Sequence, residues 1–424
     1  MTVSNSGKII GDIRFGSGDS TYSASSGTLT GAIAFGSGEN LLSLSGTTSF
    51  TNSLTIDTGG TLAVSLSDSA TLDLGTSAPL LSSLTASGSS QLVIPIATGS
   101  LGVNLTGTAS FLGDSRISLY ITDQPGTAPI QVLTAGGGIT TDHLSTLISQ
   151  DSLPYLYTLS DYGISNGTLS VTLHQRTGSE AGFTPGVAAL FDQSMVAFGN
   201  GSTFQTIANL PDQASVRAAY RQIIPAGYGS MPIRLAQALT TGASGAVRGR
   251  LDTVAAMEPW RESDAIGFTP WTQQSANLIR QRDKLDDPGF ESDRYTLSFG
   301  ADYALTRSLT VGLASSFAWD DVRIDGMTAV SNKPFSVNSK LVDLYAGWHG
   351  GPFFAQLSAG YGWTSYDFQR EITIGDILAT QSSRWSGTIL SGDAVVGARF
   401  ALGRFSIEPS TASLTPGSGR AATR

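Results

Sequence analysis

The stretch RYTLSFGADYALTRSLTVGLASSFAWDD, residues 294–321, decides how the C-terminal part of this chain folds. Almost every second residue is apolar or aromatic, and the residues between them are small or polar. The apolar positions are Tyr295, Leu297, Phe299, Ala301, Tyr303, Leu305, Leu309, Val311, Leu313, Phe317 and Trp319. A period of two places alternate side chains on opposite faces of a β-strand. The stretch therefore predicts two antiparallel strands joined by a short turn.

Two environments produce strands with one apolar and one polar face. A soluble β-domain covers the apolar face with a second sheet, whereas a membrane barrel exposes that face to lipid and turns the polar face toward a wet lumen. The alternation here continues for 12 or more residues, while soluble strands usually have about five or six. Aromatic residues also gather near strand ends, as at Tyr303, Phe317 and Trp319. These features favour the barrel, with a soluble β-domain as the alternative.

The same alternation returns further along the chain. It is clear in PFFAQLSAGYGWTSY (352–366) and in WSGTILSGDAVVGARFAL (385–402). Short connections such as LTRS alternate with long ones such as DGMTAVSNKP and ITIGDILATQSS, as in barrels with short periplasmic turns and longer outer loops. The predicted strands are 268–280, 293–305, 308–323, 337–348, 352–368 and 384–402, with a stub at 404–408.

Composition and charge exclude several classes of protein. The chain of 424 residues has no cysteine, so disulfides and thiolate metal or redox sites are excluded. Its net charge of −9 argues against a protein that binds the phosphate backbone of nucleic acids. Residues 1–175 hold 3 Lys/Arg and 11 Asp/Glu, a net of −8, so the remaining residues are nearly balanced. This shift indicates a domain boundary near residue 175.

The N-terminal part contains an internal repeat. GDIRFGSGDSTYS begins at Gly11 and GAIAFGSGENLLS begins at Gly31, with seven identities at a spacing of 20 residues. Short apolar strands separated by Gly/Ser/Asn turns at such a period predict a stacked β-solenoid. Later candidate strands at 53–66, 70–75, 91–96, 116–121 and 167–174 depart from this spacing.

Three helical segments lie between the two β-regions. FTPGVAALFDQSMVAF places Thr184 as the N-cap and Pro185 in the first turn. A second helix is predicted over 210–225 and a third over 231–256, although Gly242 and Gly245 weaken the third by about 1 kcal/mol each relative to alanine. No run of 18 apolar residues predicts a transmembrane helix. The first residues, MTVSNSGKIIGDIRFGSG, also lack the basic and apolar regions of a secretory signal.

No motif in the chain predicts an enzyme. A G-x-S-x-G elbow, a P-loop and an H-E-x-x-H sequence are all missing, and His143, His174 and His349 are isolated. GDST (18–21) and GDSR (113–116) resemble the nucleophile block of one esterase family, but no D-x-x-H partner follows. We therefore expect no catalytic residue, no cofactor-binding residue and no metal ligand.

The order of these segments resembles a bacterial autotransporter, the type V secretion family. The similarity lies in LPDQASVRAAYRQIIPAGYGSMP (210–232), in DRYTLSFGADYALTRSLTVGLASSF (293–317) and, in part, in RFSIEPSTASL (404–414). GTLSVTLHQ followed by FTPGVAALFDQ is similar to the junction between passenger and linker. Residues 165–410 carry the resemblance in sequence, and residues 1–165 carry it only in architecture.

The resemblance implies an all-β chain in four parts. Residues 1–176 are the β-solenoid passenger fragment, and 177–265 are a helical linker that includes a candidate lumen helix at 231–252. Residues 266–409 are an antiparallel meander that forms about half of a 12-stranded outer-membrane β-barrel, and 410–424 are a disordered tail. Polar residues of the lumen helix would face the polar side of the strands; these are Arg234, Gln237, Thr240, Ser244, Arg248 and Arg250.

The implied function is insertion into the outer membrane and display of the chain's own passenger at the cell surface. The implied partners are outer-membrane lipid, the barrel assembly machinery, periplasmic chaperones and ligands on host or other cells, with no nucleic acid. The alternative is a surface adhesin that binds through the Ser/Thr/Gly-rich solenoid. Only six strands and a stub are visible, so we expect a truncated translocator that closes no pore, because unpaired strand edges in lipid cost several kcal/mol per backbone group.

Overall fold

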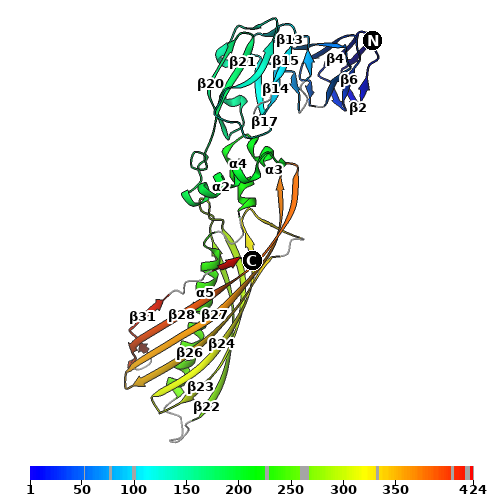
Figure 1. Cartoon of the computed structure of the whole chain (residues 1–424). Helices are drawn as coiled ribbons and strands as arrows, with labels where there is room; N and C mark the ends of the chain where they lie inside the picture. The colour runs from blue at the N-terminus through cyan, green and yellow to red at the C-terminus, as the bar shows by residue number, and fades with distance from the viewer. Residues whose placement is uncertain are drawn as a thin grey trace. The chain divides into compact units, whose positions relative to one another are not determined.

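The computed structural model describes the chain except residues 52, 76–78, 98–101, 225–228, 258–266, 331–333, 403–404, 416–420 and 424. It separates into two compact units (Figure 1). The first contains residues 1–220 with 374–377, and the second contains residues 221–373 with 378–424. Each unit is described by itself.

The first unit begins with a parallel β-solenoid. Its largest sheet contains β1 (Thr2–Asn5), β4 (Ser20–Ser25), β7 (Glu39–Ser45), β10 (Thr61–Leu66), β13 (Ser83–Ala86), β16 (Ala109–Phe111) and β19 (Ile139–Thr141). A second sheet contains β8 (Ser49–Phe50), β11 (Thr71–Asp73), β14 (Gln91–Ile96) and β17 (Arg116–Ile121). Two small sheets contain β2 (Lys8–Ile10) with β5 (Thr28–Thr30), and β3 (Ile13–Arg14) with β6 (Ile33–Phe35) and β9 (Leu54–Ile56). The predicted solenoid is thereby confirmed.

The 20-residue repeat corresponds to one step between stacked strands. Ile13 pairs with Ile33 and Ser23 with Ser43, each at the spacing read from the sequence. A Cβ on Gly36 would lie 1.8 Å from the backbone oxygen of Gly16, so close stacking of the turns requires glycine there. Leucine, isoleucine and phenylalanine side chains fill the interior, where Leu42, Leu62 and Leu92 have no exposed surface.

A third sheet and a group of helices complete the first unit. The sheet contains β12 (Leu80–Leu81), β15 (Val103–Leu105), β18 (Ile130–Ala135), β21 (Thr168–Gln175) and β20 (Tyr157–Ser165), of which β21 pairs antiparallel with both β18 and β20. The helices are α1 (Leu144–Leu147), the 3-10 turn η1 (Gln150–Ser152), α2 (Pro185–Phe198), α3 (Ser202–Ala208) and α4 (Gln213–Ile223). Helices α2 and α4 were predicted from the sequence, whereas α3 was not.

The second unit is a long antiparallel sheet with one helix along its inner face (Figure 1). The strands run in chain order: β22 (Phe268–Gln281), β23 (Phe290–Ala304), β24 (Leu309–Ile324), β26 (Phe335–Gly350), β27 (Phe353–Ile374), β28 (Ile377–Ala398) and β31 (Ser410–Thr415). Two short strands, β25 (Thr328–Ala329) and β32 (Ala421–Thr423), pair with β27 and β28. The helix is α5 (Met231–Met257). The predicted order of solenoid, helical region and antiparallel meander is confirmed.

The apolar face of this sheet is exposed, and its polar face is buried. On β23, Tyr295 is 45% exposed and Phe299 48%, while Arg294 is 3% exposed and Asp302 1%. A soluble β-domain would show the reverse, because water favours burial of the apolar side. Among the described residues no second sheet covers the apolar face. The exposed apolar face therefore favours the barrel over a soluble β-domain.

The ends of the meander differ from the sequence prediction. The segment ITIGDILATQSS was expected to be a long loop, but β27 and β28 continue through it and turn tightly at Gly375, whose φ is +55°. The predicted stub at 404–408 becomes β30 (Phe405–Ile407), paired only with β29 (Phe400–Leu402). Strand β31 pairs with β28 within the segment 410–424, which was expected to be disordered. The open edge of β28 supplies the backbone partners for it.

The predicted domain boundaries remain predictions. The boundary at 265/266 lies outside the described residues. At 176/177, helices α2 and α3 belong to the same compact unit as the solenoid. Gln124 of the solenoid donates to the Met195 carbonyl oxygen of α2, and Asn209, which follows α3, donates to the Ile121 carbonyl oxygen. None of the described helices is long and apolar enough to cross a membrane.

Candidate functional site in the helix-bearing sheet

The inner face of the sheet holds α5 through three apolar contacts along the helix. Met231 and Leu235 pack in the first against Phe335, Phe368 and Trp385. Leu239 and Ala243 lie in the second with Leu341 and Ile389, and Val247 and Leu251 lie in the third with Ala314 and Tyr345. The apolar residues of α5 recur at helical spacing, so one stripe of the helix lies along the strands.

A buried ion pair fixes the N-terminal half of α5. Arg294 on β23 and Asp320 on β24 are directly opposite in the sheet register. Arg294 donates from Nε to Asp320 Oδ1 at 2.8 Å and from Nη2 to the Leu235 carbonyl oxygen at 2.9 Å. The side chains of the pair are 2% and 0% exposed. The guanidinium therefore joins two strands to the backbone of the helix.

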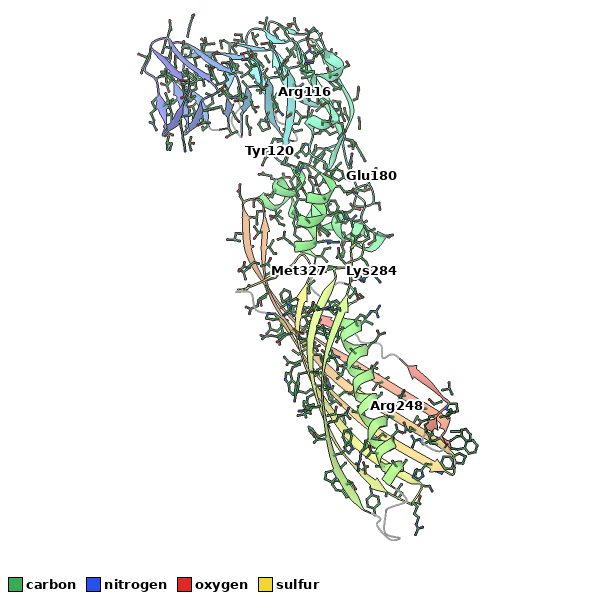
Figure 2. The ribbon with its side chains drawn as sticks, turned by 180° about the vertical axis from the view of Figure 1, so that it is seen from behind. Arg116, Tyr120, Glu180, Arg248, Lys284 and Met327 are labelled. Atoms are coloured by element: carbon green, nitrogen blue, oxygen red, sulfur yellow. The ribbon has the colours of Figure 1, made fainter. Side chains whose placement is uncertain are left out.

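Two further ion pairs fix the C-terminal half of α5. Arg250 donates from Nε to Asp302 Oδ2 at 2.6 Å. Arg248 donates from Nε to Asp393 Oδ2 at 2.9 Å, and Figure 2 labels Arg248 on the helix beside the strands. Bidentate arginine–carboxylate geometry gives these contacts direction as well as charge. They hold α5 at both β23 and β28.

An aromatic pair closes the contact near the end of α5. Trp271 on β22 donates from Nε1 to the Tyr345 hydroxyl oxygen at 2.8 Å. Tyr345 lies over Gly312, its cross-strand neighbour, where a Cβ would come within 2.2 Å of the ring. Glycine at position 312 thus makes room for the tyrosine on the inner face.

The structure distributes the six predicted lumen-helix residues unevenly. Arg248 and Arg250 reach strand carboxylates. Thr240 and Ser244 are buried, and Arg234 and Gln237 are exposed. The sequence analysis did not identify Arg294, Asp302, Asp320 or Asp393 as partners. The alternation of the strands places these four residues on the polar face, and this could be read from the sequence. It does not show which carboxylate pairs with which arginine.

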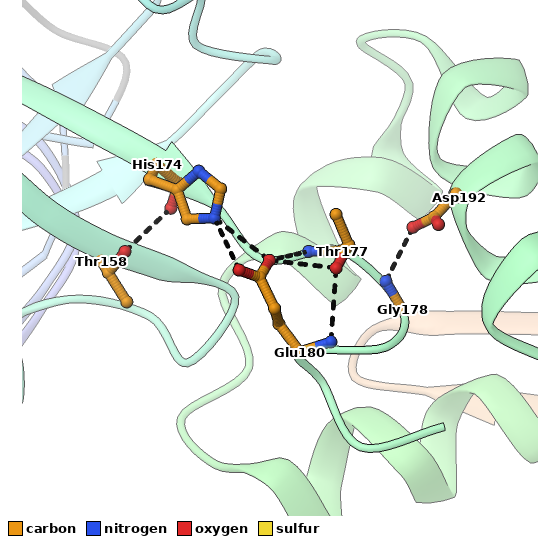
Figure 3. Close-up of polar contacts among 6 residues, drawn as sticks. All are labelled: Thr158, His174, Thr177, Gly178, Glu180 and Asp192. Atoms are coloured by element: carbon orange, nitrogen blue, oxygen red, sulfur yellow. Dashed lines mark hydrogen bonds and ion pairs between the residues drawn. The ribbon is translucent and has the colours of Figure 1, made fainter. Parts of the chain in front are cut away.

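His143 and His174 make local hydrogen bonds with neighbouring residues. No group of three or more His, Cys, Asp or Glu able to hold a metal occurs among the described residues. His174 contacts Glu180 at 3.1 Å, and Thr177 donates to Glu180 from its backbone N–H at 2.8 Å (Figure 3). These hydrogen bonds lower the pKa of Glu180 to about 2. The bond from the Thr177 backbone has the largest effect, and the bond from His174 has the next largest. The arrangement ties the end of β21 to the loop before α2.

The GDSR segment lies beside a histidine without forming a nucleophilic site. Ser115 Oγ is buried inside the solenoid, and His143 Nε2 instead contacts the Ser115 carbonyl oxygen at 2.7 Å. Asp142 accepts from Nδ1 of the same ring. Partial burial lowers the pKa of His143, but the hydrogen bonds with Asp142 and Ser115 outweigh it, so the pKa is raised. His143 therefore completes the hydrogen bonding of the β17 edge.

A sheet with an apolar exterior and a polar inner face has the side-chain distribution of an outer-membrane β-barrel. Residues 270–414 match the family model of the autotransporter beta-domain. This part of the chain is thus an autotransporter β-domain, preceded by a β-solenoid of passenger type. The domain is a translocator of the outer membrane and not a catalytic domain. A search of curated proteins found no match to the chain.

Proposed function

We propose that the β-domain anchors this chain in the outer membrane and displays the solenoid at the cell surface. The observation that carries the proposal is the inverted sheet, whose polar face holds α5 through Arg248, Arg250 and Arg294. Because α5 follows the solenoid and its helices in the chain, a helix held inside the sheet connects the membrane anchor to the passenger.

The exposed aromatic residues support a membrane setting for the strands. Tyr295 and Tyr303 on β23 lie on the same outer face, eight residues apart. That separation is about 27 Å along a strand, or about 21 Å after a tilt of roughly 40°. The apolar band of outer-membrane barrels is about 25 Å tall, so the two tyrosines would lie near its two interfaces. Lipid, the assembly machinery and periplasmic chaperones are the partners that this setting requires.

Surface display is tested by expressing the chain with an export signal and adding protease to intact cells. Residues 1–176 should be digested from outside, while the strands from residue 268 onward remain in the outer-membrane fraction. Protection of the solenoid until the cells are lysed would contradict display. Recovery of the whole chain in the soluble fraction would contradict membrane anchoring as well.

We also propose that this chain by itself closes no pore. Among the described strands, β22 pairs only with β23, so the sheet has an open edge on that side. Unpaired backbone groups in lipid cost several kcal/mol each. The summed cost over a few residues of an open edge exceeds the folding stability of a typical protein. Planar-bilayer recordings of the purified chain should show no discrete conductance. A stable unit conductance from a monomer would overturn this prediction.

Adhesion through the solenoid is the second candidate function. One row of seven hydroxyl residues crosses the largest solenoid sheet, each paired with the next; the row is Ser4, Ser23, Ser43, Ser65, Thr85, Ser110 and Thr140. Adjacent strands lie about 4.8 Å apart, so the row presents hydroxyls at a regular spacing without charge.

The adhesive role is tested by introducing lysine into that row. Ser43→Lys with Ser65→Lys should reduce binding of the purified chain to cell surfaces about ten-fold. The matched control, Thr71→Lys with Gln91→Lys, places the same charges on the second solenoid sheet and should leave binding unchanged. Equal loss in both variants would point to non-specific charge effects and contradict a site on the hydroxyl row.

A further inference from the structure

A basic cleft lies between the first half of α5 and strands β22 and β23. Its volume is about 600 Å³. Four cationic side chains line it, Arg234, Arg280, Lys284 and Arg294, and no carboxylate side chain does. Amide and hydroxyl groups of Gln237, Asn277 and Thr241 are also part of its wall. The lining therefore offers hydrogen-bond donors and positive charge together.

Two of the four cations have no acidic partner within the part of the chain that the structure describes. Arg294 pairs with Asp320, and Arg280 pairs with Glu291 at 3.2 Å, which Arg323 also contacts. The side chains of Arg234 and Lys284 make no hydrogen bond or ion pair with the described residues. Asp287, the nearby acid, accepts from Ser230 and Gln281 instead. Arg234 and Lys284 are therefore the two lining cations that no described carboxylate pairs with, although Asp287 lies at the border of the cleft.

The guanidinium of Arg294 places a fixed positive charge behind the same wall. Its Nη1 is buried without a hydrogen-bond partner, while Nε and Nη2 are engaged by Asp320 and the Leu235 carbonyl. Arginine fixed in this way cannot turn toward solvent. It keeps positive charge behind the cleft, where the surrounding protein screens it less than water would.

We propose that this cleft binds a phosphate group. A phosphate monoester carries about −1.5 to −2 charges at neutral pH and three acceptor oxygens, which match the two unpaired cations and the neighbouring donors. Arginine and lysine are the side chains that bind phosphate in proteins. The group comes either from a lipid headgroup or from free phosphate.

The position of the cleft suggests the lipid source. Asn277 is the cross-strand neighbour of Arg294, and the next residue, Tyr295, lies at the same level of the sheet on its opposite, outer face. Because β22 is the open edge of the described sheet, a lipid headgroup at that level can reach the inner face around it. Aromatic girdles lie at the level of lipid headgroups. The lipid source rests on the proposed membrane function, whereas binding of free phosphate does not depend on it.

Titration of the full chain in neutral detergent at physiological salt tests the cleft. Inorganic phosphate and micelles carrying phosphatidic acid are the two probes, with phosphatidylcholine micelles as the blank. Each of Arg234→Gln and Lys284→Gln should weaken binding about ten-fold, and the double variant about 100-fold. Arg282→Gln removes a neighbouring charge outside the lining and should change binding less than two-fold.

The outcomes distinguish a lipid headgroup from free phosphate, and they distinguish failure of the phosphate site from failure of surface display. Tighter binding of phosphatidic acid than of inorganic phosphate assigns the lipid headgroup, and equal affinities assign free phosphate. Saturable binding that is lost in the double variant supports the cleft even if surface display fails in cells. Absence of saturable binding to both probes, or equal weakening by Arg282→Gln, would overturn the phosphate site. Near-UV circular dichroism confirms that each variant keeps its tertiary structure.

Discussion

At the scale of single residues, the buried pair of Arg294 and Asp320 matters most for the position of α5. Removing one partner of a buried pair leaves an uncompensated charge, at a cost of about 3–5 kcal/mol. Arg294→Met should therefore lower the free energy of unfolding in detergent by about that amount and expose α5 to protease. The measurement is a urea titration followed by tryptophan fluorescence.

A surface pair between β22 and β23 provides the control. Arg280 and Glu291 are 67% and 36% exposed, and exposed pairs contribute about 0–1 kcal/mol. Arg280→Met should therefore change the unfolding free energy by less than about 1 kcal/mol. Replacing both Arg294 and Asp320 with apolar residues should recover part of the loss. Equal effects of Arg280→Met and Arg294→Met would show that burial does not determine how much an ion pair contributes to the free energy of unfolding.

Glu180 gives the first unit a predictable response to acid. Its pKa falls from 4.5 to about 2 through hydrogen bonds from Thr177 and His174. A depressed carboxylate pKa stabilises the fold above the unfolded value, and this contribution is lost as the pH falls toward 2. Glu180→Gln should flatten the dependence of the melting temperature between pH 4.5 and 2. Asp151→Asn is the matched control, and an unchanged slope in Glu180→Gln would contradict the assignment.

At the scale of elements, glycines decide where strands and helix approach each other. Tyr345 occupies the space above Gly312, so Gly312→Ala would displace the ring and break its hydrogen bond with Trp271. Overpacking of this kind costs about 1–3 kcal/mol. Gly245 on α5 has no atom near its missing Cβ, so Gly245→Ala should stabilise the helix by about 1 kcal/mol. Thermal unfolding of both variants tests the contrast, and destabilisation by Gly245→Ala would contradict it.

At the scale of the whole molecule, α3 completes the solenoid at the β17 edge. Asn209, which follows α3, donates from Nδ2 to the Ile121 carbonyl at 2.7 Å and accepts from the Ile121 N–H at 2.7 Å. Gln205 donates to the Thr122 carbonyl at 2.9 Å. These amides occupy the place of a further strand. The helices between solenoid and sheet are therefore part of the folded solenoid unit.

Truncation tests that arrangement. A fragment 1–220 should unfold at higher urea than a fragment 1–176, because each unpaired backbone group costs about 1–3 kcal/mol. Asn209→Leu should lower the stability of fragment 1–220. Asn209→Asp should lower it as well, because a carboxylate oxygen then faces the Ile121 and Gln205 carbonyl oxygens to which Nδ2 donates. Equal stability of the two fragments would support the boundary predicted at residue 176.

The sequence alone determined the order of solenoid, helical region and antiparallel meander, but it did not show α3 or β31. Alternation at Tyr295, Phe299 and Tyr303 specified an exposed apolar face, and the 20-residue repeat specified stacked strands, because both patterns are local. Only the tertiary structure decided which charges meet. Arg248 and Asp393 are 145 residues apart, and Asn209 and Ile121 are 88 apart. Such pairs depend on how distant segments close on each other, and no local period encodes that closure.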